Sequence, residues 1–121
     1  ALSLKNLNYD VEIIDNLEIN NLYHFQKTDI DNKSIYMKFI NQRLEYLKKS
    51  KIPVHEFDAR NYDGLKTIMR SIKPDIVIHF AAVAHANKSN KDPHSTFDHS
   101  LRTLENVLDN VRVNKTHLIY L

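Results

Sequence analysis

The sequence has 121 residues, the size of one domain, with 42% hydrophobic and 26% charged residues, a composition typical of globular rather than disordered proteins. Seventeen Lys and Arg against fifteen Asp and Glu give a net charge of +2, too small for a nucleic-acid-binding surface. The absence of cysteine excludes disulfides and thiolate metal sites, and no apolar run reaches the ~18 residues of a membrane span. We therefore expect a cytoplasmic protein that binds neither nucleic acid nor membrane.

The first half of the chain predicts helix, strand, loop and helix. Leucines in residues 1–7 suit the last turns of a helix, and Asn8 suits the left-handed conformation that ends one. Val11–Asp15 is an apolar run typical of a buried parallel strand. Residues 16–31 are polar and predict a loop with room for a helical turn. Lys33–Lys49 predicts a helix, with an inward apolar stripe of Ile35, Tyr36, Phe39, Ile40, Leu44 and Leu47.

The middle of the chain repeats the pattern. Ile52–Phe57 predicts a strand, and a helix opening at Asp63 ends before Pro74, because the residue before a proline is forced out of helical geometry. Ile76–Phe80 then predicts a central strand.

The last third adds a helix and a strand. A loop over residues 81–91 leads to Asp92-Pro93, which suits a helix start because proline fits the first turn. Thr116–Leu121 predicts a final strand. A core-facing helical stripe is expected from Phe97, Leu101, Leu104, Leu108 and Val111. The alternation of strands and helices predicts an α/β, doubly wound parallel sheet.

Asp15 is the first candidate functional residue. A carboxylate at the end of the second strand of such a sheet holds the adenosine ribose of a dinucleotide. It repels the 2′-phosphate of NADP, so the expected cofactor is NAD; a solvated strand-end Asp is the alternative. The glycine-rich turn that precedes such an acid by roughly 20 residues would fall before Ala1. Gly64 is the single glycine, so we expect an internal excerpt without the first strand and that turn.

Further candidates follow the later strands. Asp58 is placed to accept from the adenine amine, or to cap a helix. The small residues Ala81 and Ala82 after Phe80 allow close approach of a cofactor, or tight helix packing. His85, in the following loop, is a candidate contact to a polar substrate, or a plain loop histidine. The seven histidines show no zinc spacing, so no metal site is expected.

An ordered set of short motifs resembles the extended short-chain dehydrogenase/reductase superfamily, and within it the nucleotide-sugar epimerases and dehydratases. The loop at 20–23 and the helix segment at 43–47 are similar to the UDP-glucuronate 4-epimerase branch. The motifs are Asp15-Asn16-Leu17, Asp58-Ala59-Arg60-Asn61, Ile76-Val77-Ile78-His79-Phe80-Ala81-Ala82, Asp92-Pro93 and Asn106-Val107-Leu108.

The resemblance implies an NAD-dependent enzyme that acts on a nucleotide-sugar through a transient 4-keto sugar, as a homodimer. It implies no catalytic residue within residues 1–121, which would form part of the NAD-binding domain. Ser100 stands where members often carry Asn, and Thr103-Leu104 where they carry Gly-Thr. The implied cofactor contacts are Asp15, Asn16, Asp58, Ala59, Phe80, Ala81, Ala82 and Ser100.

The family strand order, 3-2-1-4-5, implies that the two strand pairs of this chain lack a common neighbour. We therefore expect the 121 residues alone to be unstable or rearranged, and inactive. Two other functions remain open. One is a non-catalytic NAD-binding or sensor protein of the same fold. The other is a phosphate-binding or response-regulator-like α/β module that uses Asp15 and Asp58 as an acidic cluster, which predicts magnesium affinity and no effect of NAD.

Overall fold

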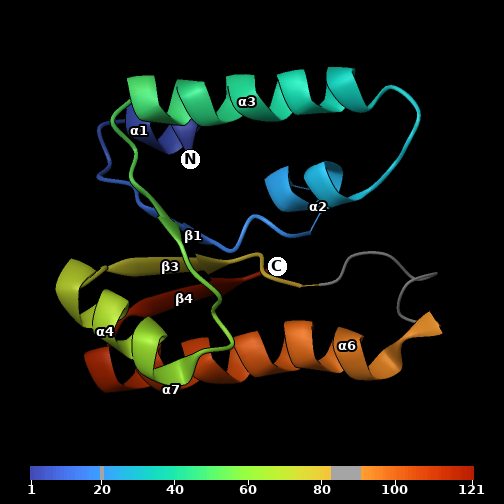
Figure 1. The fold of residues 1–121 in the computed structure, drawn as a ribbon. Helices are drawn as coiled ribbons and strands as arrows, with labels where there is room; N and C mark the ends of the chain where they lie inside the picture. The colour runs from blue at the N-terminus through green and yellow to red at the C-terminus, as the bar shows by residue number, and fades with distance from the viewer. Residues whose placement is uncertain (20, 83–90) are drawn as a thin grey trace. The chain divides into compact units, whose positions relative to one another are not determined.

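The computed structural model describes residues 1–19, 21–82 and 91–121. The chain divides into two compact units, Ala1–Phe57 and Asp58–Leu121, each considered by itself. The first unit contains α1 (Leu2–Asn6), β1 (Ile13–Asp15), α2 (Leu22–Lys27), α3 (Lys33–Lys49) and β2 (Val54–Glu56). The second contains α4 (Tyr62–Ile72), β3 (Ile76–His79), α6 (Pro93–Phe97), the π-helical turn η1 (Asp98–Arg102), α7 (Thr103–Asn114) and β4 (His117–Tyr120) (Figure 1).

The first unit has the predicted order of elements. β1 pairs with β2 in parallel, with Ile13 opposite Val54 and Asp15 opposite Glu56. Both strands are shorter than their apolar runs. The helix over Lys33–Lys49 is confirmed with the predicted bounds, and the predicted loop contains the short helix α2. Asn8 has a φ of 65°, the left-handed geometry expected where α1 ends.

The predicted inward stripe of α3 is wrong in part. Ile40 and Leu47 are buried, whereas Ile35 and Phe39 are 50% and 64% exposed. The predicted stripe included apolar residues from about half of the helix circumference. Within the unit, other residues cover only the narrower face that carries Ile40 and Leu47. Tyr36, another residue of the predicted stripe, stacks on Phe25, with ring centroids 5.1 Å apart.

The second unit is a parallel strand pair with helices against one face. β3 pairs with β4, with Ile76 opposite His117 and His79 opposite Tyr120, and α7 packs against both strands and against α4 (Figure 1). The side chain of Asn61 caps α4 by accepting from the Gly64 amide at 3.2 Å. The helix ends where expected, at a left-handed residue before Pro74.

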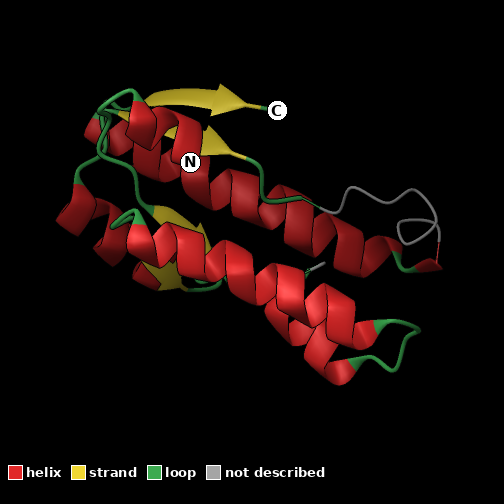
Figure 2. Cartoon of the chain, turned by 90° about the horizontal axis from the view of Figure 1, so that it is seen from above, coloured by secondary structure: helices red, strands yellow, loops and turns green. Residues whose placement is uncertain are grey.

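The helices α6, η1 and α7 follow one another as a single rod (Figure 2). Asp92 caps the rod as predicted, because its side chain accepts from the Ser95 amide at 2.9 Å. The predicted core stripe is wrong in part, since Phe97, Leu101 and Leu108 are exposed whereas Val111 is buried. The π turn shifts the following side chains around the axis, and the buried face of α7 consists of Thr103, Asn106, Val107, Asn110 and Val111.

The described strands form two parallel sheets of two strands each, β1-β2 and β3-β4. This pairing agrees with the expected strand neighbours and with an α/β fold. Within residues 1–19, 21–82 and 91–121, no helix has the length and apolar character needed to cross a membrane.

The strand pairs lead to a prediction about the 121 residues expressed alone. A two-stranded sheet leaves a row of backbone N–H and C=O groups unpaired along each outer edge. We expect urea unfolding followed by circular dichroism to show no single cooperative monomeric transition, and sizing chromatography to show association. A sharp two-state transition of a monomer would contradict this expectation.

Candidate functional site

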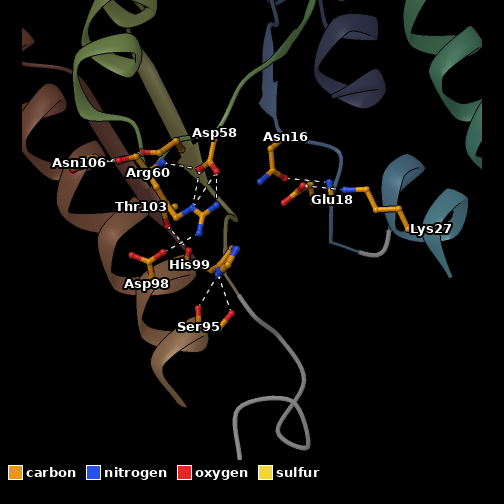
Figure 3. A network of polar contacts seen from close by, with 11 residues as sticks. Asn16, Glu18, Lys27, Asp58, Arg60, Ser95, Asp98, His99, Thr103 and Asn106 are labelled. Carbon is orange, nitrogen blue, oxygen red and sulfur yellow. Dashed lines mark hydrogen bonds and ion pairs between the residues drawn. The ribbon is translucent and has the colours of Figure 1, made fainter. Parts of the chain in front are cut away.

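Asp15 is the last residue of β1, and its carboxylate organises the turn that follows. Oδ1 accepts from the Leu17 amide at 2.7 Å, and Oδ2 accepts from the side-chain amide of Asn21 at 3.3 Å. Leu17 is buried at a φ of 57°, so the chain turns sharply after the strand. Next to Asp15, Asn16 accepts from the Glu18 amide at 3.1 Å (Figure 3).

The Asp15 turn is tied to α3 through Asn21. Asn21 is 7% exposed, and its Oδ1 accepts from the Leu22 amide and from the Arg43 guanidinium, both at 2.9 Å. These two donors to the Asp15 carboxylate are neutral amides. Neutral donors do not offset the negative charge of a carboxylate, and each carboxylate oxygen can accept more than one hydrogen bond.

In the second unit, Asp58 follows β2 and forms an ion pair with Arg60. The Nε of Arg60 lies 3.0 Å from both carboxylate oxygens of Asp58, and its Nη1 lies 2.8 Å from Asp98 in η1. Figure 3 shows the guanidinium between the two carboxylates. The hydrogen bonds that Arg60 donates to Asp58 and to Asp98 raise the pKa of Arg60 above its ordinary value. The arrangement fixes Asp58 relative to the π turn.

The side chain of Asn106 binds the backbone of the same turn. Its side-chain Nδ2 lies 2.9 Å from the carbonyl oxygens of both Ala59 and Arg60, and the residue is 5% exposed. A buried amide that donates to a loop satisfies backbone acceptors that a strand would otherwise satisfy. The turn after β2 is thus bound to the helical rod at two places, through Asp98 in η1 and Asn106 in α7.

The turn after β3 is bound to the same helical rod. The hydroxyl of Thr103 lies 3.1 Å from the carbonyl oxygen of Ala81, while Phe80 and Ala82 are exposed. Ser100 lies in η1 and is partly buried, and its carbonyl is within hydrogen-bond distance of the Thr103 hydroxyl. His85 lies outside the described residues.

In the second unit, three predicted residues are connected to the rod: Asp58 through Arg60 and Asp98, Ala59 through Asn106, and Ala81 through Thr103. Ser100 is part of the rod itself. Arg60, Thr103 and Asn106 were not predicted as site residues. The signal for Arg60 was its position two residues after Asp58, where a cation meets an acidic side chain. For Thr103 and Asn106 the sequence carried no comparable signal, because polar residues occur throughout α7.

Within the described parts of the chain, no group of three His, Asp or Glu side chains is placed to hold a metal ion. A shallow hollow of about 690 Å³ lies between α7 and the amino end of β4, near Arg112 and His117. Ligands of parallel α/β sheets bind beyond the carboxyl ends of the strands. The hollow is therefore not the predicted cofactor position.

The model of the GDP-mannose 4,6 dehydratase family matches residues 19–120. The chain belongs to this family. The match covers most of the described residues, including Asp58, the turn after β3 and the α6–α7 rod. The predicted relationship to the nucleotide-sugar epimerases and dehydratases of the extended short-chain dehydrogenase/reductase superfamily is confirmed, whereas the finer likeness to UDP-glucuronate 4-epimerases remains a prediction. A comparison with curated proteins finds no match.

Solved structures agree with the family assignment in fold. A UDP-glucose 4-epimerase from Stenotrophomonas maltophila with bound NAD and formylated UDP-arabinopyranose has a TM-score of 0.74 at 19% identity. The UDP-Glc/GlcNAc 4-epimerase from Campylobacter jejuni and Pal from Bacillus thuringiensis give 0.69 and 0.70, both at 16% identity.

These alignments cover 98% of this chain and 31%, 32% and 33% of the three others, in that order. The chain thus spans about a third of the length of these structures, and the predicted Rossmann-like fold, in incomplete form, is confirmed.

The contact of Asn106 with the turn after β2 predicts a stability effect. Asn106→Leu keeps the side-chain volume but removes the donor to both carbonyls, which costs about 1–3 kcal/mol in unfolding free energy. Chemical denaturation of the full-length protein measures this loss. Asn114→Leu is the matched control, because Asn114 is exposed on the same helix and bonds only to its own helix, at the Asn110 carbonyl. Equal effects of the two substitutions would refute the role of Asn106.

His79 predicts a pH effect. It is 4% exposed and stacked on Tyr120, and its Nε2 is buried without a hydrogen-bond partner among the residues described. Burial lowers the pKa of His79 from its ordinary value of 6.5, because desolvation disfavours the charged ring.

The unfolded state therefore binds a proton that the folded state rejects, so stability falls as the pH drops below about 6.5. We expect the melting temperature of full-length His79→Phe to fall less between pH 7 and pH 5 than that of the wild type. His117→Phe, at an exposed position on β4, is the control. Parallel pH profiles for wild type and His79→Phe would disprove the assignment.

Proposed function

We propose that residues 1–121 form part of the NAD-binding domain of a nucleotide-sugar epimerase or dehydratase. The observation that carries this proposal is the position of Asp15 at the carboxyl end of a parallel strand, in a chain that belongs to the GDP-mannose 4,6 dehydratase family. The NAD in the epimerase from Stenotrophomonas maltophila supports the choice of cofactor.

The chemistry of the Asp15 turn fits an adenosine ribose. A carboxylate whose donors among the described residues are the neutral amides of Leu17 and Asn21 is a strong acceptor for two adjacent hydroxyls. The side-chain amide of Asn16 adds a donor and an acceptor next to it. The same negative charge opposes a 2′-phosphate, so the site selects NAD over NADP.

The turn after β2 fits the adenine side. Arg60 neutralises Asp58 and holds it by paired hydrogen bonds, so the carboxylate is a fixed acceptor for the exocyclic amine. The Ala59 backbone, held by Asn106, forms the wall beside it. The exposed turn at Phe80, Ala81 and Ala82 completes the cofactor contacts, with Ser100 nearby on the rod.

When bound, NAD supplies hydride acceptance and return, which allows a sugar to pass through a 4-keto form. The part of the protein in residues 1–121 binds and orients the cofactor and contributes no catalytic group; His85 is proposed to contact the substrate. The full-length protein is proposed to be a cytoplasmic homodimer.

The proposal predicts the effect of Asp15→Asn in the full-length protein. Asparagine keeps an oxygen for the Leu17 amide but loses the charge, and hydrogen bonds to a charged group contribute about 1.5–3 kcal/mol. We expect NAD to bind about tenfold or more weakly, and the preference for NAD over NADP to shrink, in calorimetric titrations.

Asp10→Asn is the control for this experiment, because the Asp10 side chain is fully exposed at 105% and precedes β1. Unchanged NAD affinity in Asp15→Asn would contradict the assigned role of Asp15. A wild-type protein that ignores NAD and binds magnesium ions would favour the acidic-cluster alternative instead.

A further inference from the structure

Thr103 joins the helical rod to the turn after β3. It is 5% exposed at the junction of η1 and α7. Its Oγ1 lies 3.1 Å from the carbonyl oxygen of Ala81, 2.8 Å from that of His99 and 3.0 Å from that of Ser100. A hydroxyl has one hydrogen to donate. The acceptors at His99 and Ser100 belong to the rod itself, so the contact with Ala81 is the one that links two elements.

The contact fixes the direction of one peptide plane. In a trans peptide, the carbonyl and the following N–H lie in one plane and point in opposite directions. Because the Ala81 carbonyl faces Thr103, the N–H of Ala82 is directed away from the rod. Ala81 and Ala82 are both exposed and carry only a methyl side chain, so a ligand can approach this N–H closely.

The alternative to a positioning role is that the Thr103 hydroxyl only bonds within its own helix. Threonine often bonds to the carbonyl four residues earlier in its own helix, and Thr67 on α4 does so, with its Oγ1 2.9 Å from the Asp63 carbonyl. Thr103 has the same kind of acceptor available at His99, but it differs from Thr67 in that the Ala81 carbonyl is also within reach of its hydroxyl hydrogen. Thr67 therefore isolates the helical contribution from the contribution of the cross-element contact.

We propose that Thr103 is a positioning residue that aims the backbone N–H of Ala82 at an oxygen of the bound dinucleotide, on its ribose or phosphate. The inference rests on the proposed function, since it assumes that the turn after β3 faces NAD. Thr103 does not touch the cofactor; it acts through the peptide plane between Ala81 and Ala82.

The test compares three variants of the full-length protein by calorimetric titration with NAD. Thr103→Val has nearly the same shape without the donor, and one neutral hydrogen bond corresponds to about a 3- to 10-fold change in affinity. We expect that loss for Thr103→Val, near-wild-type affinity for Thr103→Ser, and no change for Thr67→Val. Melting temperatures without ligand report any general loss of stability separately.

The outcomes are distinguishable. NAD binding by the wild type with equal affinity in Thr103→Val overturns the inference and leaves the proposed function standing. Equal weakening in Thr103→Val and Thr103→Ser also overturns it, because the methyl group and not the hydroxyl would then matter. A wild type that does not bind NAD overturns both. If Thr103→Val does not fold, Thr103→Ala, which introduces no new atoms, takes its place with the same expected loss.

Discussion

The second unit depends on polar side chains that a helix buries against the turns following two strands. Asn106 donates to the carbonyls of Ala59 and Arg60, and Thr103 lies within hydrogen-bond distance of the carbonyl of Ala81. Asp98, one π turn earlier, holds Arg60 and through it Asp58. Loop backbone groups need partners when they are buried. One helical rod supplies these partners for both turns and so fixes the backbone around the proposed cofactor contacts.

The same constraint explains why sequence patterns predicted the elements well and the helix face poorly. Strand and helix order, the bounds of α3 and the start at Asp92-Pro93 depend on local periodicity and capping, which the sequence carries directly. The stripe from Phe97 to Leu108 was predicted as core because hydrophobic spacing was the only guide. The π turn is a local irregularity, whereas the bonds of Asn106 join residues far apart in sequence. Neither leaves a signal in apolar spacing.

Strand lengths and site residues also divide into features that local sequence predicts and features that depend on tertiary contacts. The apolar runs at Val11–Asp15 and Ile52–Phe57 extend beyond the paired residues of β1 and β2, and Ile52 is buried although it precedes β2. Asp15 and Asp58 were recognised as strand-end acids, a position set by local sequence. The partners that orient them, Asn21 and Arg60, became evident only from the folded chain. The proposed binding of NAD depends mainly on these two acids.

The central claim is that Asp15 holds the adenosine ribose of NAD. A crystal structure of the full-length protein with NAD tests it most directly. The account predicts ribose hydroxyl oxygens within about 3 Å of the Asp15 carboxylate. NAD bound away from Asp15 would contradict it.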